Sequence, residues 1–332
     1  MQNQPIISVD NVSKTFFVHR REPGFISSLR SLFVRRKSAV HALDKVSLSI
    51  GEGEIVGLIG ANGAGKTTLV KILSGIIHPG GGAVSVMGHN PWQRKNSFRS
   101  NISLIMGQKA QLWWDLPAAD CFLLLREIYR IPDAAFRERL DFLASTLAVT
   151  GHLTTQIRRL SLGERMKMEL IAALLHNPKV VFLDEPTIGL DLTAQKAIRS
   201  FILAYRDRHR PAMIITSHYM EDIKSLCERI VILRKGAVVY DGALAHIVSD
   251  HATHKIIKVL LDEDHGLQDP EEILPASLGS LVTREEKKFE FRVPRGAAAE
   301  AATHLLRNLP VEDLTINEPD IGTVIESIIR EG

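Results

Sequence analysis

The sequence predicts an α/β fold in which helices cover both faces of a largely parallel sheet. Three runs, Lys179–Asp184, Ala212–Thr216 and Ile230–Leu233, have the length and near-continuous apolar composition of buried strands. A fourth apolar run, Ile55–Ile59, leads through a glycine-rich turn into the helical pattern of Thr68–Leu73. Buried strands that alternate with helical patterns are typical of a sheet covered on both sides.

The glycine-rich turn, Gly60–Thr67, fits the pattern G-x-x-x-x-G-K-[ST] and has a strand before it and a helix after it. In this context, backbone N–H groups and the helix N-terminus bind phosphate. Lys66 is expected to reach the β- and γ-phosphates of a nucleoside triphosphate, and the Thr67 hydroxyl to ligate Mg²⁺. A glycine-rich turn with a surface lysine is the structural alternative, which the strand–loop–helix context disfavours. The predicted nucleotide contacts are Gly60, Asn62, Gly63, Ala64, Gly65, Lys66, Thr67 and Thr68.

Two acidic residues, Asp184 and Glu185, follow the apolar strand Val180–Leu183. Asp184 is predicted to hold the hydrated Mg²⁺. Glu185 lies at the carboxyl end of the strand, where open α/β sheets bind ligands, and is predicted to polarise the attacking water as a general base. An acidic strand end is common in α/β proteins, but with the phosphate loop the pair predicts triphosphate hydrolysis.

A helical block, about residues 108–178, is predicted as an insertion in this core. Its patterns predict helices over Ala118–Arg130, Asp133–Val149 and Leu162–His176, with Asp133 as an N-cap. Short strands around the phosphate loop are predicted at Ile6–Val9, Val46–Ile50 and Ala83–Val86, and the family resemblance described below implies that they form an antiparallel β subdomain.

Residues 246–332 are predicted to form a separate small α+β domain after the α/β core, which takes up residues 1–245. Strand patterns occur at Ile256–Leu260 and Phe289–Val293, followed by an amphipathic helix over Gly296–Leu309. Pro319 opens a last helix with Val324, Ile325, Ile328 and Ile329 on its inner face. No part of this domain shows catalytic spacing, so we expect a dimerisation or regulatory module.

The composition is that of a globular protein: 45% of the 332 residues are hydrophobic and 24% are charged. No apolar stretch reaches the roughly 18 to 20 residues that span a bilayer. The first five residues are polar and lack a signal-peptide core. Cys121 and Cys227 lie in apolar helical patterns, which predicts buried free thiols in a reducing compartment.

Charge is unevenly distributed along the chain. Residues 1–50 carry eight basic residues against three acidic ones, whereas residues 251–332 carry nine against sixteen. Much of the basic charge lies in a predicted insertion, about residues 20–38, where Gly24–Lys37 has apolar residues at helical spacing. Such a basic amphipathic segment predicts a helix that binds a membrane surface or a partner. A solvated helix packed on its own domain is the alternative.

The ordered motifs resemble those of ATP-binding-cassette (ABC) nucleotide-binding subunits over about residues 5–245. They are Gly60–Thr67, Gln108, Leu160–Glu164, Val180–Glu185, Gly189–Asp191 and His218. The resemblance implies a head-to-tail dimer that sandwiches two ATP molecules with Mg²⁺. In it, the Ser161–Glu164 loop of one copy, with Ser161, Gly163 and Glu164, faces the phosphate loop of the other.

The resemblance also implies roles for single residues. His218 would contact the γ-phosphate and join Lys66 and Glu185 as a catalytic residue. Asp191 would cross the dimer interface. Gln108 would contact Mg²⁺ and sense the membrane partner, with Gln111 as its rival, and Phe16 would stack on adenine, with Phe17 as its rival.

The loop at 160–164 departs from the common Leu-Ser-Gly-Gly-Gln, because Leu162 and Glu164 replace a glycine and the glutamine. Ser161-x-x-Glu164 is also a capping box, in which the two residues satisfy each other's N–H groups. The two interpretations are compatible, since a capped helix start still directs its dipole at an opposing phosphate.

The helical block and the residues Glu318–Ile321 resemble the ATPases of type-2 ABC exporters, although Gly322 departs from the acidic residue common there. The resemblance implies an ATP-hydrolysing subunit, a homodimer or heterodimer, that powers export through a separate membrane permease. Its location would be peripheral, on the cytoplasmic face of the inner or plasma membrane, and no nucleic-acid partner is expected. A soluble ABC ATPase and an importer ATPase are the alternatives.

Overall fold

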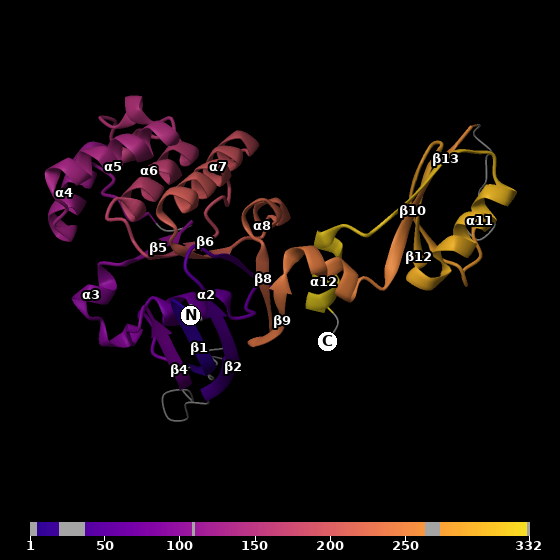
Figure 1. The fold of residues 1–332 in the computed structure, drawn as a ribbon, viewed down its shortest axis with the longest axis horizontal. Helices are drawn as coiled ribbons and strands as arrows, with labels where there is room; N and C mark the ends of the chain where they lie inside the picture. The colour runs from indigo at the N-terminus through magenta and orange to yellow at the C-terminus, as the bar shows by residue number, and fades with distance from the viewer. Residues whose placement is uncertain (1–4, 20–36, 108–109, 263–272, 331–332) are drawn as a thin grey trace, which may run out of the picture. The chain divides into compact units, whose positions relative to one another are not determined.

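The computed structural model describes residues 5–19, 37–107, 110–262 and 273–330. The chain divides into two compact units, Met1–Leu244 and Ala245–Gly332. Gln108 and nearly all of the basic segment at 20–38 lie outside the described residues. Each unit is described by itself below, with the element labels of Figure 1.

The first unit is built on a six-stranded sheet in the order β5-β6-β7-β3-β8-β9. Five strands run parallel, and β9 pairs antiparallel with β8 at the edge. The strands are β3 (Ile55–Ile59), β5 (Ile102–Met106), β6 (Val180–Asp184), β7 (Ala212–Thr216), β8 (Arg229–Arg234) and β9 (Ala237–Ala243). Every residue of β3 and β7 is buried, as their continuous apolar sequences predict. The predicted α/β class and largely parallel sheet are confirmed.

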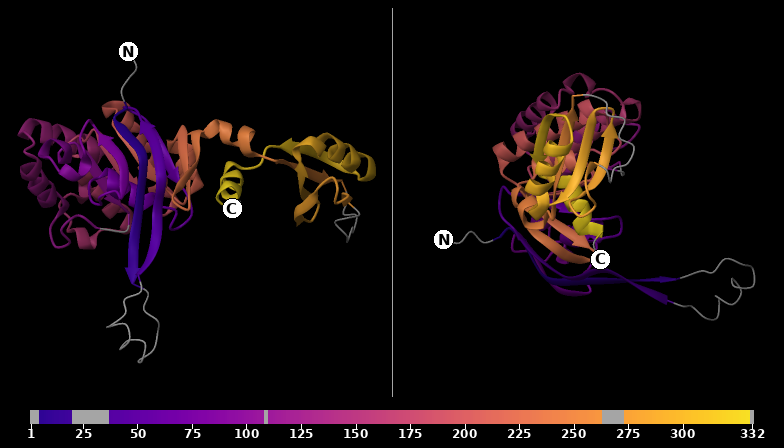
Figure 2. Two further views of the ribbon diagram at one scale, coloured as in Figure 1. Left: turned by 90° about the horizontal axis from the view of Figure 1, so that it is seen from below. Right: turned by 90° about the vertical axis from the view of Figure 1, so that its right-hand side faces the viewer.

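A three-stranded antiparallel sheet, in the order β2-β1-β4, forms the second layer. Its strands are β1 (Ile7–His19), β2 (Lys37–Ile50) and β4 (Gly81–Val86). Helix α2 (Lys66–Leu73) lies between the two sheets, and Leu69 and Ile72 are fully buried in their shared core. Beyond Ser13, where the pairing of β1 with β4 ends, β1 and β2 continue as the two-stranded ribbon that Figure 2 shows.

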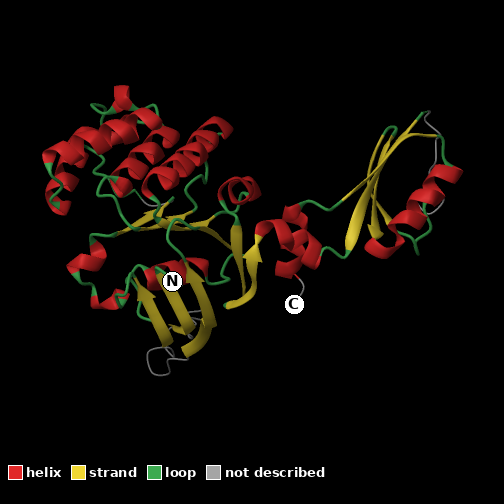
Figure 3. Cartoon of the chain, viewed as in Figure 1, coloured by secondary structure: helices red, strands yellow, loops and turns green. Residues whose placement is uncertain are grey.

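Helices cover the six-stranded sheet on its other side (Figure 3). They include α4 (Ala118–Tyr129), α5 (Asp133–Thr146), α6 (Leu162–Leu174), α7 (Leu192–His209) and α8 (Met220–Leu226), and α3 (Asn96–Arg99) follows β4. Single 3₁₀ turns lie at Pro91–Gln93, Thr150–His152, Ile157–Arg159, Leu244–His246 and Arg295–Ala297. The prediction of Asp133 as an N-cap is wrong: Pro132 takes the cap position with no side-chain cap, and Asp133 is the first helical residue.

The second unit is a four-stranded antiparallel sheet, in the order β11-β12-β10-β13, with a helix against it. Its elements are α9 (Ile247–His251), β10 (His254–Leu261), β11 (Ser280–Glu285), β12 (Lys288–Pro294), α11 (Ala298–Asn308), β13 (Val311–Asn317) and α12 (Ile321–Arg330). Ala301 and Leu305 of α11 pack with Ile257 and Phe291 in a core of its own. In the part of the chain that the structure describes, no helix is long and apolar enough to cross a membrane.

Candidate functional site

The phosphate loop joins β3 to α2. Gly65 is the N-cap of α2 with a left-handed φ of 111°, and a Cβ there would collide with the Ala42 carbonyl oxygen, so only glycine fits. The Lys66 Nζ atom donates hydrogen bonds to the carbonyl oxygens of Gly60, at 2.6 Å, and Ala61, at 3.1 Å. Burial lowers the pKa of Lys66 below its ordinary value, against the opposing effect of Glu185 and Asp184. The loop therefore holds the Lys66 ammonium group through two of its own carbonyl oxygens at the start of α2.

The Asp184 carboxylate, at the end of β6, connects this loop to the neighbouring strand. The Thr67 hydroxyl donates to one carboxylate oxygen at 3.2 Å, and the Thr216 hydroxyl donates to the other at 2.5 Å. A hydroxyl beside a carboxylate is a donor pair that suits Mg²⁺, which usually takes one or two protein oxygens together with phosphate and water. Thr67 and Asp184 therefore fit a magnesium site of the kind predicted.

Glu185 and His218 meet at the ends of β6 and β7. The His218 Nε2 atom lies 2.8 Å from the Glu185 Oε1 atom, and both side chains are partly exposed. Glu185 has a left-handed φ of 57°, and its N–H group donates to the Thr216 carbonyl oxygen at 3.0 Å and to the Thr216 hydroxyl at 3.1 Å. The backbone thus turns the Glu185 side chain out of the strand, where water can reach it.

Lys66, Thr67, Asp184, Glu185 and His218 are therefore gathered at the carboxyl ends of β3, β6 and β7, which are neighbours in the sheet. Of the predicted loop contacts, Asn62 and Gly63 are exposed, and Thr68 is half-buried. Such a cluster at one edge of a parallel sheet can bind a phosphate chain beside a group that accepts a proton.

The Ser161–Glu164 motif begins α6 as a complete capping box. The Glu164 N–H group donates to the Ser161 hydroxyl at 3.3 Å, and the Ser161 N–H group donates to the Glu164 carboxylate at 2.9 Å. The hydrogen bonds from Ser161, the backbone one first, hold the pKa of Glu164 below its ordinary value. Gly163 lies against Ala194 of α7. Among the described residues, hydrogen bonds join Ser161 and Glu164 to each other and not to the phosphate loop.

Asp191 and Phe16 lie on other elements. Asp191 caps α7, where its carboxylate accepts the Ala194 N–H group at 2.8 Å. Phe16, on β1, is half-buried with the Lys14 ammonium 5.3 Å from its ring centroid, whereas Phe17 is 68% exposed. Gln111, the rival of Gln108, donates its side-chain amide to the Leu104 carbonyl oxygen at 2.7 Å, at β5.

A comparison with curated proteins decides the family. The uncharacterized ABC transporter ATP-binding protein MJ1023 of Methanocaldococcus jannaschii is 32% identical over 254 residues, which cover 75% of this chain and 89% of that protein. The chain belongs to the ATP-binding proteins of ABC transporters. A family model for ABC transporters matches residues 43–188, and one for the C-terminal domain of EvrA-like ABC transporters matches residues 253–317. The chain is therefore an ATP-binding subunit and an ATPase.

Relatives of this ABC subunit differ in the role that their names state, one naming drug resistance and another import. The doxorubicin resistance ATP-binding protein DrrA of Mycobacterium tuberculosis is 26% identical, over 87% of this chain and 88% of that protein. The methionine import ATP-binding protein MetN of Geobacillus kaustophilus is 28% identical, over 72% of each. Among solved structures, the ADP- and phosphate-bound dimer of the ATP-binding cassette MJ0796 has a TM-score of 0.58 and 22% identity, over 71% of this chain and 98% of that one. This likeness confirms the cassette fold.

Several residues around the ABC site are not predicted by the sequence motifs. Asp222 of α8 is fully buried and accepts hydrogen bonds from residues beside Glu185 and His218, and Arg199 of α7 pairs with it. Gly107 precedes Gln108, and a Cβ there would overlap the Glu185 carbonyl oxygen. An acidic residue on a short helix has no sequence signature of burial, so only its amphipathic position could have suggested it.

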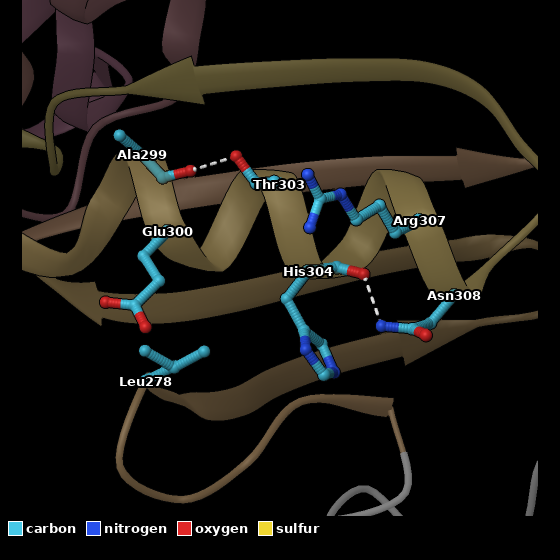
Figure 4. Close-up of a pocket in the computed structure, with 7 residues that line it drawn as sticks. All are labelled: Leu278, Ala299, Glu300, Thr303, His304, Arg307 and Asn308. Carbon is cyan, nitrogen blue, oxygen red and sulfur yellow. Dashed lines mark hydrogen bonds between the residues drawn. The ribbon is translucent and has the colours of Figure 1, made fainter.

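The second unit of this ABC subunit carries a hollow of about 570 Å³ along α11, shown in Figure 4. Two of its polar side chains are engaged within the helix: the Thr303 hydroxyl donates to the Ala299 carbonyl oxygen, and the Asn308 amide to the His304 carbonyl oxygen, both at 2.8 Å. None of the predicted site residues lines it. All predicted site residues that the structure describes belong to the first unit.

Proposed function

We propose that this ABC subunit hydrolyses ATP with Mg²⁺ at composite sites of a head-to-tail dimer, and thereby powers export through a separate membrane permease. The 2.8 Å contact between Glu185 and His218, beside Lys66 and Asp184 at one sheet edge, carries the proposal. It combines a phosphate-binding loop, a carboxylate that can accept a proton, and an imidazole that orients it.

The residues of one copy have separate tasks in this mechanism. The Lys66 ammonium exchanges its carbonyl partners, Gly60 and Ala61, for the β- and γ-phosphate oxygens. Thr67 and Asp184 would hold Mg²⁺, which neutralises charge on the phosphates when bound. Glu185 accepts a proton from the attacking water, and His218 keeps its carboxylate in place and contacts the γ-phosphate.

The capping box supports a composite site with a second copy. Ser161 and Leu162 are exposed at the start of a 13-residue helix, and helix N-termini attract phosphate. An exposed Leu162 at that position suits a surface that a partner copy covers. Asp191, on the exposed start of α7, would lie in the same interface.

Export is supported by the likeness to DrrA, which extends over 87% of this chain. We assign residues 246–332 a dimerisation or regulatory role. We also propose that the subunit lies on the cytoplasmic face of the membrane. There the basic segment at 20–38 would bind anionic lipid. Adenine stacking on Phe16, half-buried on the β1–β2 ribbon, belongs to the same proposal.

Replacement of the proposed base tests the mechanism. We expect Glu185→Gln to lower ATP turnover by about 100-fold or more, because general-base catalysis is lost, while a non-hydrolysable ATP analogue still binds. Glu138→Gln is the matched control, since Glu138 pairs on the surface with Arg208 and should leave turnover unchanged. An unchanged rate in Glu185→Gln would remove Glu185 from the mechanism.

The transport role is tested by purification of the full chain from detergent-solubilised membranes. We expect a polytopic membrane protein to copurify, and everted vesicles that contain both proteins to accumulate the substrate on ATP addition. Copurification of a soluble complex alone favours the non-transport ATPase, and ATP-driven efflux from such vesicles favours an importer.

A further inference from the structure

A buried polar network lies behind the catalytic residues of the first unit. Its centre is the Asp222 carboxylate on α8, which is fully buried. One of its oxygens accepts a hydrogen bond from the Arg199 guanidinium of α7 at 2.9 Å. The other accepts the Ser217 hydroxyl, at 2.7 Å, and the Thr187 hydroxyl. Thr187, Ser217 and Arg199 are themselves buried.

The two hydroxyls belong to the two segments that carry the catalytic side chains. Thr187 lies two residues after Glu185, and Ser217 immediately precedes His218. A single carboxylate oxygen, Oδ2 of Asp222, therefore ties the segment after β6 to the segment after β7. The Ser217 hydroxyl also accepts the Tyr219 N–H group at 3.0 Å, so His218 is held from both sides.

The energetics favour a rigid connection. Hydrogen bonds to an ionised carboxylate are roughly twice as strong as neutral ones, and a buried carboxylate needs its donors and a counter-ion to be stable. Arg199 supplies the counter-ion from the long helix α7. If either hydroxyl moved away, the buried Asp222 carboxylate would lose a hydrogen bond that nothing replaces. The two segments therefore cannot separate without breaking the network.

We propose that Asp222 is a positioning residue for ATP hydrolysis, which sets the distance between Glu185 and His218 through Thr187 and Ser217, with Arg199 as its counter-ion. The inference rests on the proposed roles of Glu185 and His218. Those two side chains contact each other at 2.8 Å but are partly exposed, so little surrounding packing holds the pair in place. The buried network does so from behind, and a misplacement of about 1 Å can cost about 100-fold in rate.

Three variants of the purified full-length protein test this role. We expect Asp222→Asn to lower kcat for ATP by about 100-fold, with less than about a twofold change in the affinity for a non-hydrolysable ATP analogue. Thr187→Val should act in the same direction, and Thr187→Ser, which restores the hydroxyl, should recover turnover. The Thr187 pair keeps the test decisive if Asp222→Asn does not fold.

The matched control is Asp241→Asn, which breaks the ion pair that Arg229 of β8 forms with Asp241 of β9 at 2.7 Å. That pair belongs to the same sheet but touches neither catalytic segment, so the variant should lower the melting temperature and keep kcat. If Asp222→Asn and Thr187→Val behave like this control, the positioning role is wrong.

A double variant separates this inference from the proposed function. In a Glu185→Gln background, Asp222→Asn should lower the residual single-turnover rate by much less than in the wild type, because one of the two groups that it positions is already lost and only the contribution of His218 remains. A full additional loss would overturn the positioning role. Wild-type turnover in Glu185→Gln alone would instead contradict the role of Glu185.

Discussion

At the residue scale, Glu164 is the clearest departure from the common cassette motif. It stands where the ABC signature usually has glutamine, and the capping box with Ser161 folds its carboxylate back on the start of α6. His152 lies 3.4 Å away and is a second partner if it is protonated. Because the Ser161 hydrogen bonds hold the pKa of Glu164 below its ordinary value, the carboxylate stays charged at neutral pH. A negative charge therefore remains near the position proposed for the ATP of the partner copy.

We expect Glu164→Gln to lower the KM for ATP by about two- to fivefold, because the variant removes a negative charge that repels the ATP phosphates. The interaction of one charge with a helix N-terminus is about 0.3–1 kcal/mol, which sets the size of the effect. The glutamine amide oxygen can still accept the Ser161 N–H group, so the melting temperature should hardly change. Steady-state ATPase assays measure the KM.

The comparison variant is Ser161→Ala, which removes the cap at a cost of about 1 kcal/mol and should abolish most turnover. An unchanged KM in Glu164→Gln would mean that its carboxylate does not face the nucleotide. Full activity in Ser161→Ala would contradict the composite site itself.

At the element scale, His176 connects the helical block to the sheet. It follows α6, its ring stacks on Tyr129 at the end of α4 with centroids 4.0 Å apart, and its Nε2 atom lies 3.0 Å from the carbonyl oxygen of Ile102 at the start of β5. Burial lowers the pKa of His176 to about 4. The neutral imidazole is therefore part of the joint between the α4–α6 helices and the edge strand.

This joint should weaken in acid. In the unfolded chain His176 gains a proton as the pH falls through about 6.5, whereas in the folded chain it stays neutral until about pH 4. Proton uptake then favours the unfolded state, so stability is lost as the pH drops from 6.5 towards 4. His176→Gln should reduce the free energy of unfolding that is lost between pH 6.5 and pH 4 by up to about 3 kcal/mol.

Urea unfolding between pH 7 and pH 4 measures the effect. Equal slopes for the wild type and His176→Gln would show that His176 does not contribute to the acid sensitivity.

At the scale of the whole molecule, the two units have separate hydrophobic cores. The core between the two sheets of the first unit includes Phe182 of β6, and the core of the second unit includes Phe291 of β12. Both rings are fully buried. Separate cores allow the second unit to change its stability while the ATPase site stays intact.

We expect Phe291→Ala to destabilise the second unit by about 3–5 kcal/mol and to leave the thermal transition of the first unit unchanged. Phe182→Ala, two residues before Asp184, should instead destabilise the first unit and reduce turnover. Calorimetry with parallel ATPase assays distinguishes the two outcomes. A single transition that both variants lower equally would contradict independent cores.

Sequence patterns predicted the buried parallel strands well, but missed β5, β9, β11 and β13. Most residues of β11 and β13 are exposed, so their sequences lack the apolar run or clean alternation of a buried strand, whereas the apolar start of the edge strand β9, Ala237–Tyr240, is only half-buried. Long-range pairing, such as Ile257 with Ile316, forms β13, whereas β9 and β11 each pair with the adjacent strand of the chain across a short turn. The error at Asp133 is a local one, because the neighbouring Pro132 takes the N-cap position and Asp133 becomes the first helical residue.

The sequence by itself determined the phosphate loop, the Asp184–Glu185 pair and the Ser161–Glu164 capping box, since each depends on residues that are close in the chain. Only the tertiary structure showed that His218 meets Glu185, that Thr67 and Thr216 share Asp184, and that Asp222 ties the two catalytic segments together. Those contacts join residues that are far apart in the chain or buried on helices. The order of the strands in the sheet determines which of these residues come into contact, and local sequence does not encode that order.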